Sequence, residues 1–72
     1  MIVIEWTSVI SSDLLAIKYD EGTCTLYIRF RNGTYAYYSV PAAVVSGLLS
    51  ATSKGHYHAN FIKNHFAYHR II

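Results

Sequence analysis

Hydrophobic and polar residues alternate along two stretches of the chain that flank the dipeptide Asn32-Gly33. Alternation with a period of two is typical of a β-strand with one buried face, and Asn-Gly is the strongest short-range signal for a hairpin. Both central residues of the favoured type I′ turn need positive φ angles, which Asn tolerates and Gly adopts without strain. We therefore predict a two-residue turn at Asn32-Gly33. In this register Tyr27 faces Tyr38 across the hairpin.

A second hairpin follows from the preceding alternation, which ends at residues 20–23. A two-residue turn at Glu21-Gly22 pairs Tyr19 with Cys24, and directly paired residues share one face of a sheet. The two hairpins, registered separately, agree on that face, so we predict a three-stranded antiparallel meander. Its predicted core face consists of Leu15, Ile17, Tyr19, Cys24, Leu26, Ile28, Phe30, Tyr35 and Tyr37.

The opposite face of the predicted meander combines cations with tyrosines. We call Tyr27, Arg29, Arg31 and Tyr38 the Tyr/Arg face, and Lys18 joins it. Guanidinium groups match the geometry of phosphates, and every nucleobase can stack on a Tyr ring. The alternative is that a solvated antiparallel face needs β-forming and charged residues in any case. As a hypothesis, the Tyr/Arg face is a ligand-binding surface.

The second half of the chain predicts two short helices. Val40-Pro41 ends the sheet, because proline cannot donate to a ladder but suits the first turn of a helix. Residues 41–51 then place an apolar stripe at helical spacing, and residues 53–55 end this helix. A second helix starts at about His56. Its residues at helical spacing are Tyr57, Phe61, Ile62, His65 and Phe66.

These elements predict a single α+β domain over residues 1–72. Its antiparallel β-meander is packed on one face by the two short C-terminal helices. Residues 1–7 alternate as well and are a candidate fourth strand. Residues 67–72 are either a last strand or an interface segment.

Residues 52–55, just before the second helix, form a candidate anion site. Free backbone N–H groups at a helix start, the small Gly55 and the charge of Lys54 all suit a phosphate. The candidate site residues also include Ser53 from this stretch and the following His56. The stretch lacks the P-loop pattern G-x-x-x-x-G-K-[ST]. In the alternative interpretation Gly55 ends the first helix and a Ser caps the second.

Charge is distributed unevenly along the 72 residues, whose net charge is +2. All four acidic residues lie within the first 21 positions, and no carboxylate side chain follows Glu21. The long acid-free stretch favours an anionic partner. It argues against chemistry that needs paired carboxylates or a carboxylate-rich metal site.

Composition bears on assembly and on the cell compartment. Hydrophobic residues make up 53% of the chain, which is more than so short a domain buries easily, so we expect a homo-oligomer. The alternative is that the tyrosines are simply half-exposed. No apolar run is long enough to span a membrane, and the N-terminal residues do not resemble a signal peptide. With the lone Cys24, this predicts a cytoplasmic protein without membrane contact.

The four histidines at positions 56, 58, 65 and 69 raise the question of a zinc site. The chain has no H-E-x-x-H motif and only one cysteine, and no acid is close in sequence, so a structural role is favoured. Cys24 is predicted to lie mid-strand with no acid nearby to orient a His. We expect no catalytic residues, no metal and no cofactor.

Several short motifs, in their order and spacing, resemble the KTSC domain family. They are Ser11-Ser12, Tyr19-Asp20, Phe30-Arg31-x-Gly33, Tyr35-x-Tyr37, Val40-Pro41 and Ala51-x-Ser53-x-Gly55 with Ile62. The resemblance covers about Trp6 to Tyr68. Members occur at the C-terminus of some lysyl-tRNA synthetases and as stand-alone proteins of bacteria and phages. The resemblance implies no catalytic residues, and its synthetase context suggests RNA binding.

These features leave three functions open. The first is a non-catalytic, oligomeric binder of a nucleotide or a short, for example cyclic, oligonucleotide, which sequesters a signalling nucleotide as a phage-type protein. The second is an RNA- or tRNA-binding module, and the third is a structural protein–protein interaction domain. Binding of long RNA draws on many cationic contacts, and the acid-free region offers few. Charge therefore favours the first.

Overall fold

The computed structural model describes residues 3–11 and 13–72, with the backbone alone for residues 3–5. Five strands form one antiparallel sheet, and each strand pairs with its neighbours in chain order. The strands are β1 (Val3–Ser8), β2 (Leu14–Asp20), β3 (Thr25–Phe30), β4 (Gly33–Tyr37) and β5 (Tyr68–Arg70).

The predicted α+β meander is confirmed and extended by a strand at each edge. Within the described residues the candidate N-terminal strand is β1, and the C-terminal segment forms β5 beside β4. The first two residues of the candidate strand and Ser12 of the Ser11-Ser12 motif lie outside the described residues.

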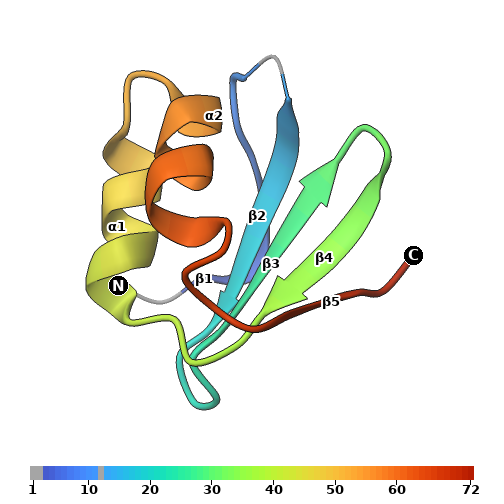
Figure 1. Ribbon diagram of the computed structural model, residues 1–72, viewed down its shortest axis with the longest axis vertical. Helices are drawn as coiled ribbons and strands as arrows, with labels where there is room; N and C mark the ends of the chain where they lie inside the picture. The colour runs from blue at the N-terminus through green and yellow to red at the C-terminus, as the bar shows by residue number, and fades with distance from the viewer. Residues whose placement is uncertain (1–2, 12) are drawn as a thin grey trace.

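Two helices and a π-helical turn connect β4 to β5. They are α1 (Ala42–Ser50), α2 (Lys54–Tyr57) and η1 (His58–Ile62). In Figure 1 the helices lie together on the left of the molecule, while β4 and β5 lie toward the right, farther from them. No helix in the described part of the chain combines the length and the apolar character that crossing a membrane would require.

The core lies between the helices and one face of the sheet. Ile17, Leu26 and Ile28 of the sheet and Val45, Leu48 and Ile62 of the helical segment are fully buried in one cluster. Burial of each such side chain contributes about 1.5–3 kcal/mol. The Tyr19 hydroxyl, also in this cluster, donates to the Val40 carbonyl oxygen over 2.6 Å.

The predicted register of the β3–β4 hairpin is wrong by two residues. Phe30 pairs with Gly33, so the turn residues are Arg31 and Asn32, and Tyr27 faces Ala36 instead of Tyr38. Asn32 does not have the positive φ angle of a type I′ turn. A shift of two residues leaves the side chains within β3 and β4 on their predicted faces, which is why hydrophobic alternation does not distinguish the two registers.

The β2–β3 hairpin is shifted in the same way. Tyr19 pairs with Leu26, and residues 21–24 form a four-residue turn in place of the predicted two. Cys24 is therefore an exposed turn residue with a φ angle of 53°, and its predicted place in the core is wrong.

An irregularity between Leu14 and Ala16 also changes the face of β2 residues. Leu14 is fully buried, whereas Leu15, which the alternation assigned to the core, is 38% exposed. In a β-bulge two residues of one strand lie opposite a single residue of the partner strand, so the alternation between the two faces of the sheet is reversed beyond the bulge.

The second predicted helix begins and ends earlier than expected. It starts at Lys54, and its last turn is the wide η1, in which the N–H of Lys63 donates to the carbonyl of His58 over 2.8 Å. His65 and Phe66 lie beyond its end. The positive φ angle of 68° at Asn64 turns the chain back toward the sheet.

Candidate functional site

Tyr27 and Arg29 of the Tyr/Arg face lie on the sheet face opposite the helices, as predicted. They alternate with the core residues Leu26 and Ile28 along β3. The Arg29 guanidinium lies 4.2 Å from the centroid of the Trp6 ring.

On the same face the Lys18 ammonium lies 5.8 Å from the Tyr27 ring centroid. Both cations of this face therefore contact an aromatic ring of the chain itself, at distances that suit cation–π attraction.

The other two members of the predicted face lie elsewhere. Arg31 belongs to the turn between β3 and β4 and lines a cavity on the helix side of the sheet. Tyr38 follows the end of β4, where its backbone N–H donates to the carbonyl of Ala67 over 2.9 Å. The structure thus separates the four residues that the predicted register brought together.

The candidate anion site at residues 53–56 is a capped helix start. The Ser53 hydroxyl accepts a hydrogen bond from the N–H of His56 over 3.3 Å, and the Lys54 ammonium donates to the Ala51 carbonyl over 3.1 Å. A Cβ atom on Gly55 would lie 3.0 Å from a carboxylate oxygen of Asp13. A carboxylate of the chain itself therefore faces this first helical turn, where it is electrostatically favourable.

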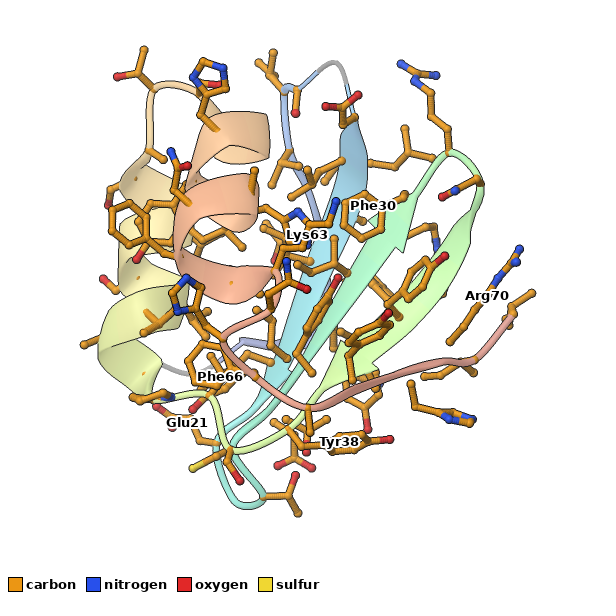
Figure 2. All side chains as sticks on the ribbon, in the orientation of Figure 1. Glu21, Phe30, Tyr38, Lys63, Phe66 and Arg70 are labelled. Carbon is orange, nitrogen blue, oxygen red and sulfur yellow. The ribbon has the colours of Figure 1, made fainter. Side chains whose placement is uncertain are left out.

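A groove of about 410 Å³ opens on the helix side of the sheet, between the β3–β4–β5 edge and the segment α2–η1. Its volume falls within the range of small-molecule sites. Figure 2 labels two of its lining residues, Phe30 and Lys63. The groove is lined by Asp13, Phe30, Asn32, Tyr35, Tyr37, Gly55, His58, Ala59, Lys63, Asn64 and Tyr68.

Aromatic rings in mutual contact form much of this lining. Phe30 meets Tyr35 edge-on at a centroid distance of 5.6 Å and His58 at 4.9 Å. Tyr68 lies 5.8 Å from Tyr37 and 6.1 Å from Tyr35. Such contacts hold the rings in place, so a planar ligand meets rings that are already ordered.

Tyr37 and His58 form the polar contact within the groove. The Tyr37 hydroxyl and the Nε2 atom of His58 are 2.8 Å apart, and the His tautomer decides which of them donates. Burial raises the pKa of Tyr37 to about 12, with smaller contributions from Tyr35 and Tyr68. Burial lowers the pKa of His58, the charge of Lys63 lowers it further, and Asp13 opposes this shift. At pH 7 the pair is therefore uncharged.

Charged groups stand around the aromatic lining. Lys63 and Asp13 are both exposed and line the groove. At the neighbouring edge the Arg70 guanidinium lies 6.0 Å from the Tyr35 ring centroid and donates to the backbone carbonyls of Asn32 and Ile72. The arrangement offers flat apolar surfaces, one cation and one carboxylate to a bound molecule.

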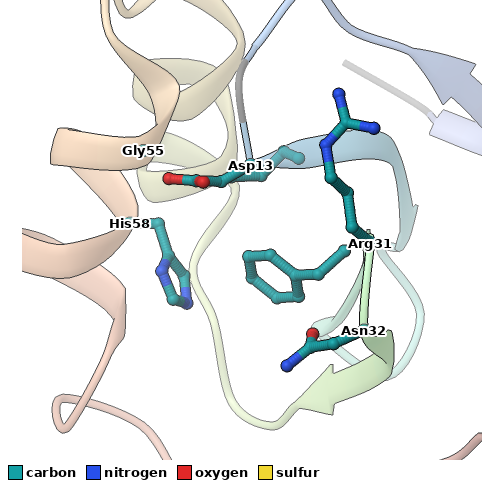
Figure 3. A pocket seen from close by; sticks show the side chains of 7 residues that line it. Asp13, Arg31, Asn32, Gly55 and His58 are labelled. Carbon is teal, nitrogen blue, oxygen red and sulfur yellow. The ribbon is translucent and has the colours of Figure 1, made fainter.

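A second cavity of about 300 Å³ adjoins the groove. Figure 3 shows the side chains of Asp13, Arg31, Asn32 and His58 around it, with Gly55 on the neighbouring helix. Arg31 and Gly55, which the sequence assigned to two separate features, therefore line one cavity. Within the described residues no three potential metal ligands come together.

Sequence reasoning missed the groove because it assigned Tyr35 and Tyr37 to the core. Tyr37 is indeed 4% exposed, but it lines the groove, and its hydroxyl contacts the Nε2 atom of His58 there. His58, Lys63 and Tyr68 come from segments whose position relative to the sheet the sequence did not predict. The available signal was the Tyr-x-Tyr motif, whose polar hydroxyls are unusual for a purely apolar core.

Comparison with known proteins gives consistent results. The KTSC domain model matches residues 10–66. A lysine–tRNA ligase of Nostoc sp. is 39% identical over 61 residues, which are 83% of this chain and 11% of the ligase. An uncharacterized protein of Stutzerimonas stutzeri is 40% identical over 63 residues, which are 85% of this chain and 89% of that protein.

Among solved structures, the crystal structure of a KTSC domain protein from Yersinia pestis superposes with a TM-score of 0.92. Its sequence is 38% identical, and the match covers 94% of this chain and 97% of that protein. The present chain spans about a tenth of the length of the lysine–tRNA ligases that it matches.

Proposed function

This chain belongs to the KTSC domain family, and on that premise we propose that it is a non-catalytic binder of a compact phosphorylated nucleotide. The observation that supports this proposal is the groove lined by Phe30, Tyr35, Tyr37 and Tyr68 with Lys63 beside them. Every nucleobase has a flat face that stacks on such rings, at about 1–3 kcal/mol per base.

The site in this proposal differs from the one the sequence suggested. The cations Arg29 and Lys18 already lie over aromatic rings of the chain, so a ligand on that face would compete with these contacts. In the groove, Tyr68 is 58% exposed and Lys63 is exposed, so both are accessible to a ligand. The groove therefore replaces the Tyr/Arg face as the preferred site.

Size and charge favour a nucleotide over a long polymer. A volume of about 410 Å³ suits a single small molecule, and one lysine lines the groove. Asp13, also in the lining, repels a dense row of phosphates and suits the amino groups of a base. A compact ligand with few phosphates fits this balance.

RNA or tRNA is the second candidate, and the specific support for it is the similarity to lysine–tRNA ligases. Binding of RNA would place the family's domain in contact with the substrate of those enzymes. Such binding depends steeply on salt, because each neutralised phosphate releases counterions. Salt dependence therefore separates the two candidates.

Binding without turnover suits sequestration of a signalling nucleotide in the cytoplasm, and we include this role in the proposal. The exposed apolar residues Ile71 and Ile72 at the C-terminal edge support assembly into a homo-oligomer.

The experiment is isothermal calorimetry with a panel of linear and cyclic nucleotides and a short RNA, at low and at physiological salt. The wild type should bind a nucleotide at both salt concentrations. Tyr68→Ala should weaken that binding by about 1–3 kcal/mol, the cost of losing a stacking partner.

Tyr38→Ala is the matched control, since Tyr38 is a similarly exposed tyrosine, at 42%, outside the groove lining. Its affinity should equal that of the wild type. Equal losses of nucleotide affinity in both variants would indicate that the binding site lies outside the groove. Retained RNA binding at physiological salt without nucleotide binding would favour the RNA candidate, and no binding at all would leave a protein–protein interaction domain.

A further inference from the structure

Asp13 places a carboxylate beside the aromatic lining of the groove. In Figure 3 this carboxylate lies near Gly55 and His58. Burial and the charge of Lys63 lower the pKa of His58, and Asp13 opposes this shift, so both charges lie within electrostatic reach of its ring. The His58 ring in turn contacts the Phe30 ring at a centroid distance of 4.9 Å. A base that stacks at these two rings therefore has a carboxylate and an ammonium group nearby.

The Asp13 carboxylate is available to a ligand. The residue is exposed, and within the described part of the chain no hydrogen bond or ion pair engages its carboxylate. A carboxylate has about four lone-pair sites on its two oxygens. The oxygen that faces Gly55 can therefore still accept a hydrogen bond from a bound molecule.

The other polar side chains of the groove discriminate less between bases. Asn32 and Asn64 also line it, but an amide both donates and accepts, so it satisfies the edge of any base. Lys63 only donates, which suits a phosphate. Asp13 is the lining side chain that only accepts, so it requires donors from the base.

From this arrangement we infer that the ligand is a guanine nucleotide, whose base donates its N1–H and its exocyclic amino group to Asp13. The inference rests on the proposed function and specifies the base. The two donors are adjacent on the Watson–Crick edge of guanine and match the two oxygens of one carboxylate. Adenine and cytosine present one amino group next to a ring nitrogen that accepts, and uracil presents one N–H between two carbonyls. Each of these bases therefore directs an acceptor at Asp13.

Calorimetry of the wild type with GMP, IMP and AMP tests this assignment. The base of IMP differs from guanine only in lacking the exocyclic amino group. We expect GMP to bind at least about tenfold more tightly than IMP, since a hydrogen bond to a charged group corresponds to about 10- to 150-fold in affinity. AMP should bind more weakly than GMP by at least the same factor.

Asp13→Asn exchanges one acceptor oxygen for a donor at nearly unchanged volume. It should reduce the preference for GMP over IMP to less than about threefold. It should also bind XMP, whose base has a carbonyl in place of the amino group, more tightly than GMP. Asp20→Asn is the control, because Asp20 is an exposed carboxylate outside the groove lining and should leave all preferences unchanged. Thermal melting verifies that both variants are folded.

Equal affinities of the wild type for GMP and IMP, or tighter binding of AMP than of GMP, would overturn the guanine inference and leave the proposed function intact. A preference of Asp13→Asn for GMP over IMP or XMP as large as that of the wild type would overturn it as well, because another group would then recognise the amino group. If no nucleotide binds, the proposed function fails and the inference fails with it.

Discussion

Gly33, the first residue of β4, lies against Arg70 and the C-terminal Ile72, and we predict that Gly33→Ala strongly destabilises the protein. The φ angle of Gly33 is 153°, a conformation that residues with a side chain rarely adopt. An added Cβ atom would also lie 2.6 Å from the carbonyl oxygen of Ile72 and 2.8 Å from the Nε atom of Arg70. Arg70 can move its flexible side chain, but the Ile72 carbonyl belongs to the backbone.

The expected cost has two parts. Backbone strain at a residue with a side chain in this conformation costs about 1–3 kcal/mol. Displacement of the C-terminus breaks the hydrogen bonds between Thr34 and residues 71–72, of which the shortest is 2.8 Å, at about 0.5–1.5 kcal/mol each. With three such hydrogen bonds we expect a total loss of about 2.5–7.5 kcal/mol, a large share of the stability of so small a domain.

Urea denaturation followed by circular dichroism measures this loss. Gly22→Ala is the control, because its Cβ atom would lie 3.3 Å from the mobile carboxylate of Asp20 in an exposed turn. It should change stability by no more than about 0.5 kcal/mol. Deletion of residues 71–72 removes the obstructing carbonyl, so Gly33→Ala should cost less in that background. A Gly33→Ala protein as stable as the wild type, or an equal cost in both backgrounds, would refute this reasoning.

Two further predictions concern His58 and assembly. The pKa of His58 is lowered in the folded protein, so the unfolded chain binds the proton more readily. The contribution of His58 to stability should therefore be constant above about pH 7 and should decrease as the pH falls through 6.5 toward 5. Urea denaturation across this pH range measures the free energy of unfolding. His58→Gln should make its dependence on pH less steep, and an unchanged dependence would contradict the assignment of this effect to His58. The exposed Ile71 and Ile72 predict a dimer or larger assembly. A monomer found by light scattering at tens of micromolar would contradict this prediction.

The alternation of residues predicted the faces of β3 and β4 correctly but not the register, and it wrongly placed Leu15 and Cys24 in the core. Ile28 and Tyr37 lie in the core and Arg29 lies on the opposite face, although both hairpins are shifted by two residues. Alternation is insensitive to an even shift, so the local preference of Asn32-Gly33 for a two-residue turn decided the prediction. In the structure Thr34 bonds to residues 71 and 72, a long-range contact that the local pattern does not contain.

The candidate site was less predictable than the fold. Residues 53–56 do lie at a helix start, but Asp13, some 40 positions earlier in the chain, faces this turn and supplies its negative charge. The groove likewise needs Tyr68 from β5 beside Tyr35 and Tyr37 from β4. Such neighbours depend on how the helical segment returns the chain to the sheet, which periodicity does not specify.

The central claim, that the groove binds a nucleotide, is tested most directly by titrating the ¹⁵N-labelled protein with each nucleotide of the calorimetric panel and recording ¹H–¹⁵N correlation spectra. We predict that the largest shift changes occur at amides around Phe30, His58, Lys63 and Tyr68, and that those of Tyr27 and Arg29 on the opposite face change least. Largest changes at Tyr27 and Arg29 would place the site on the Tyr/Arg face, and spectra unchanged by every nucleotide of the panel would contradict nucleotide binding.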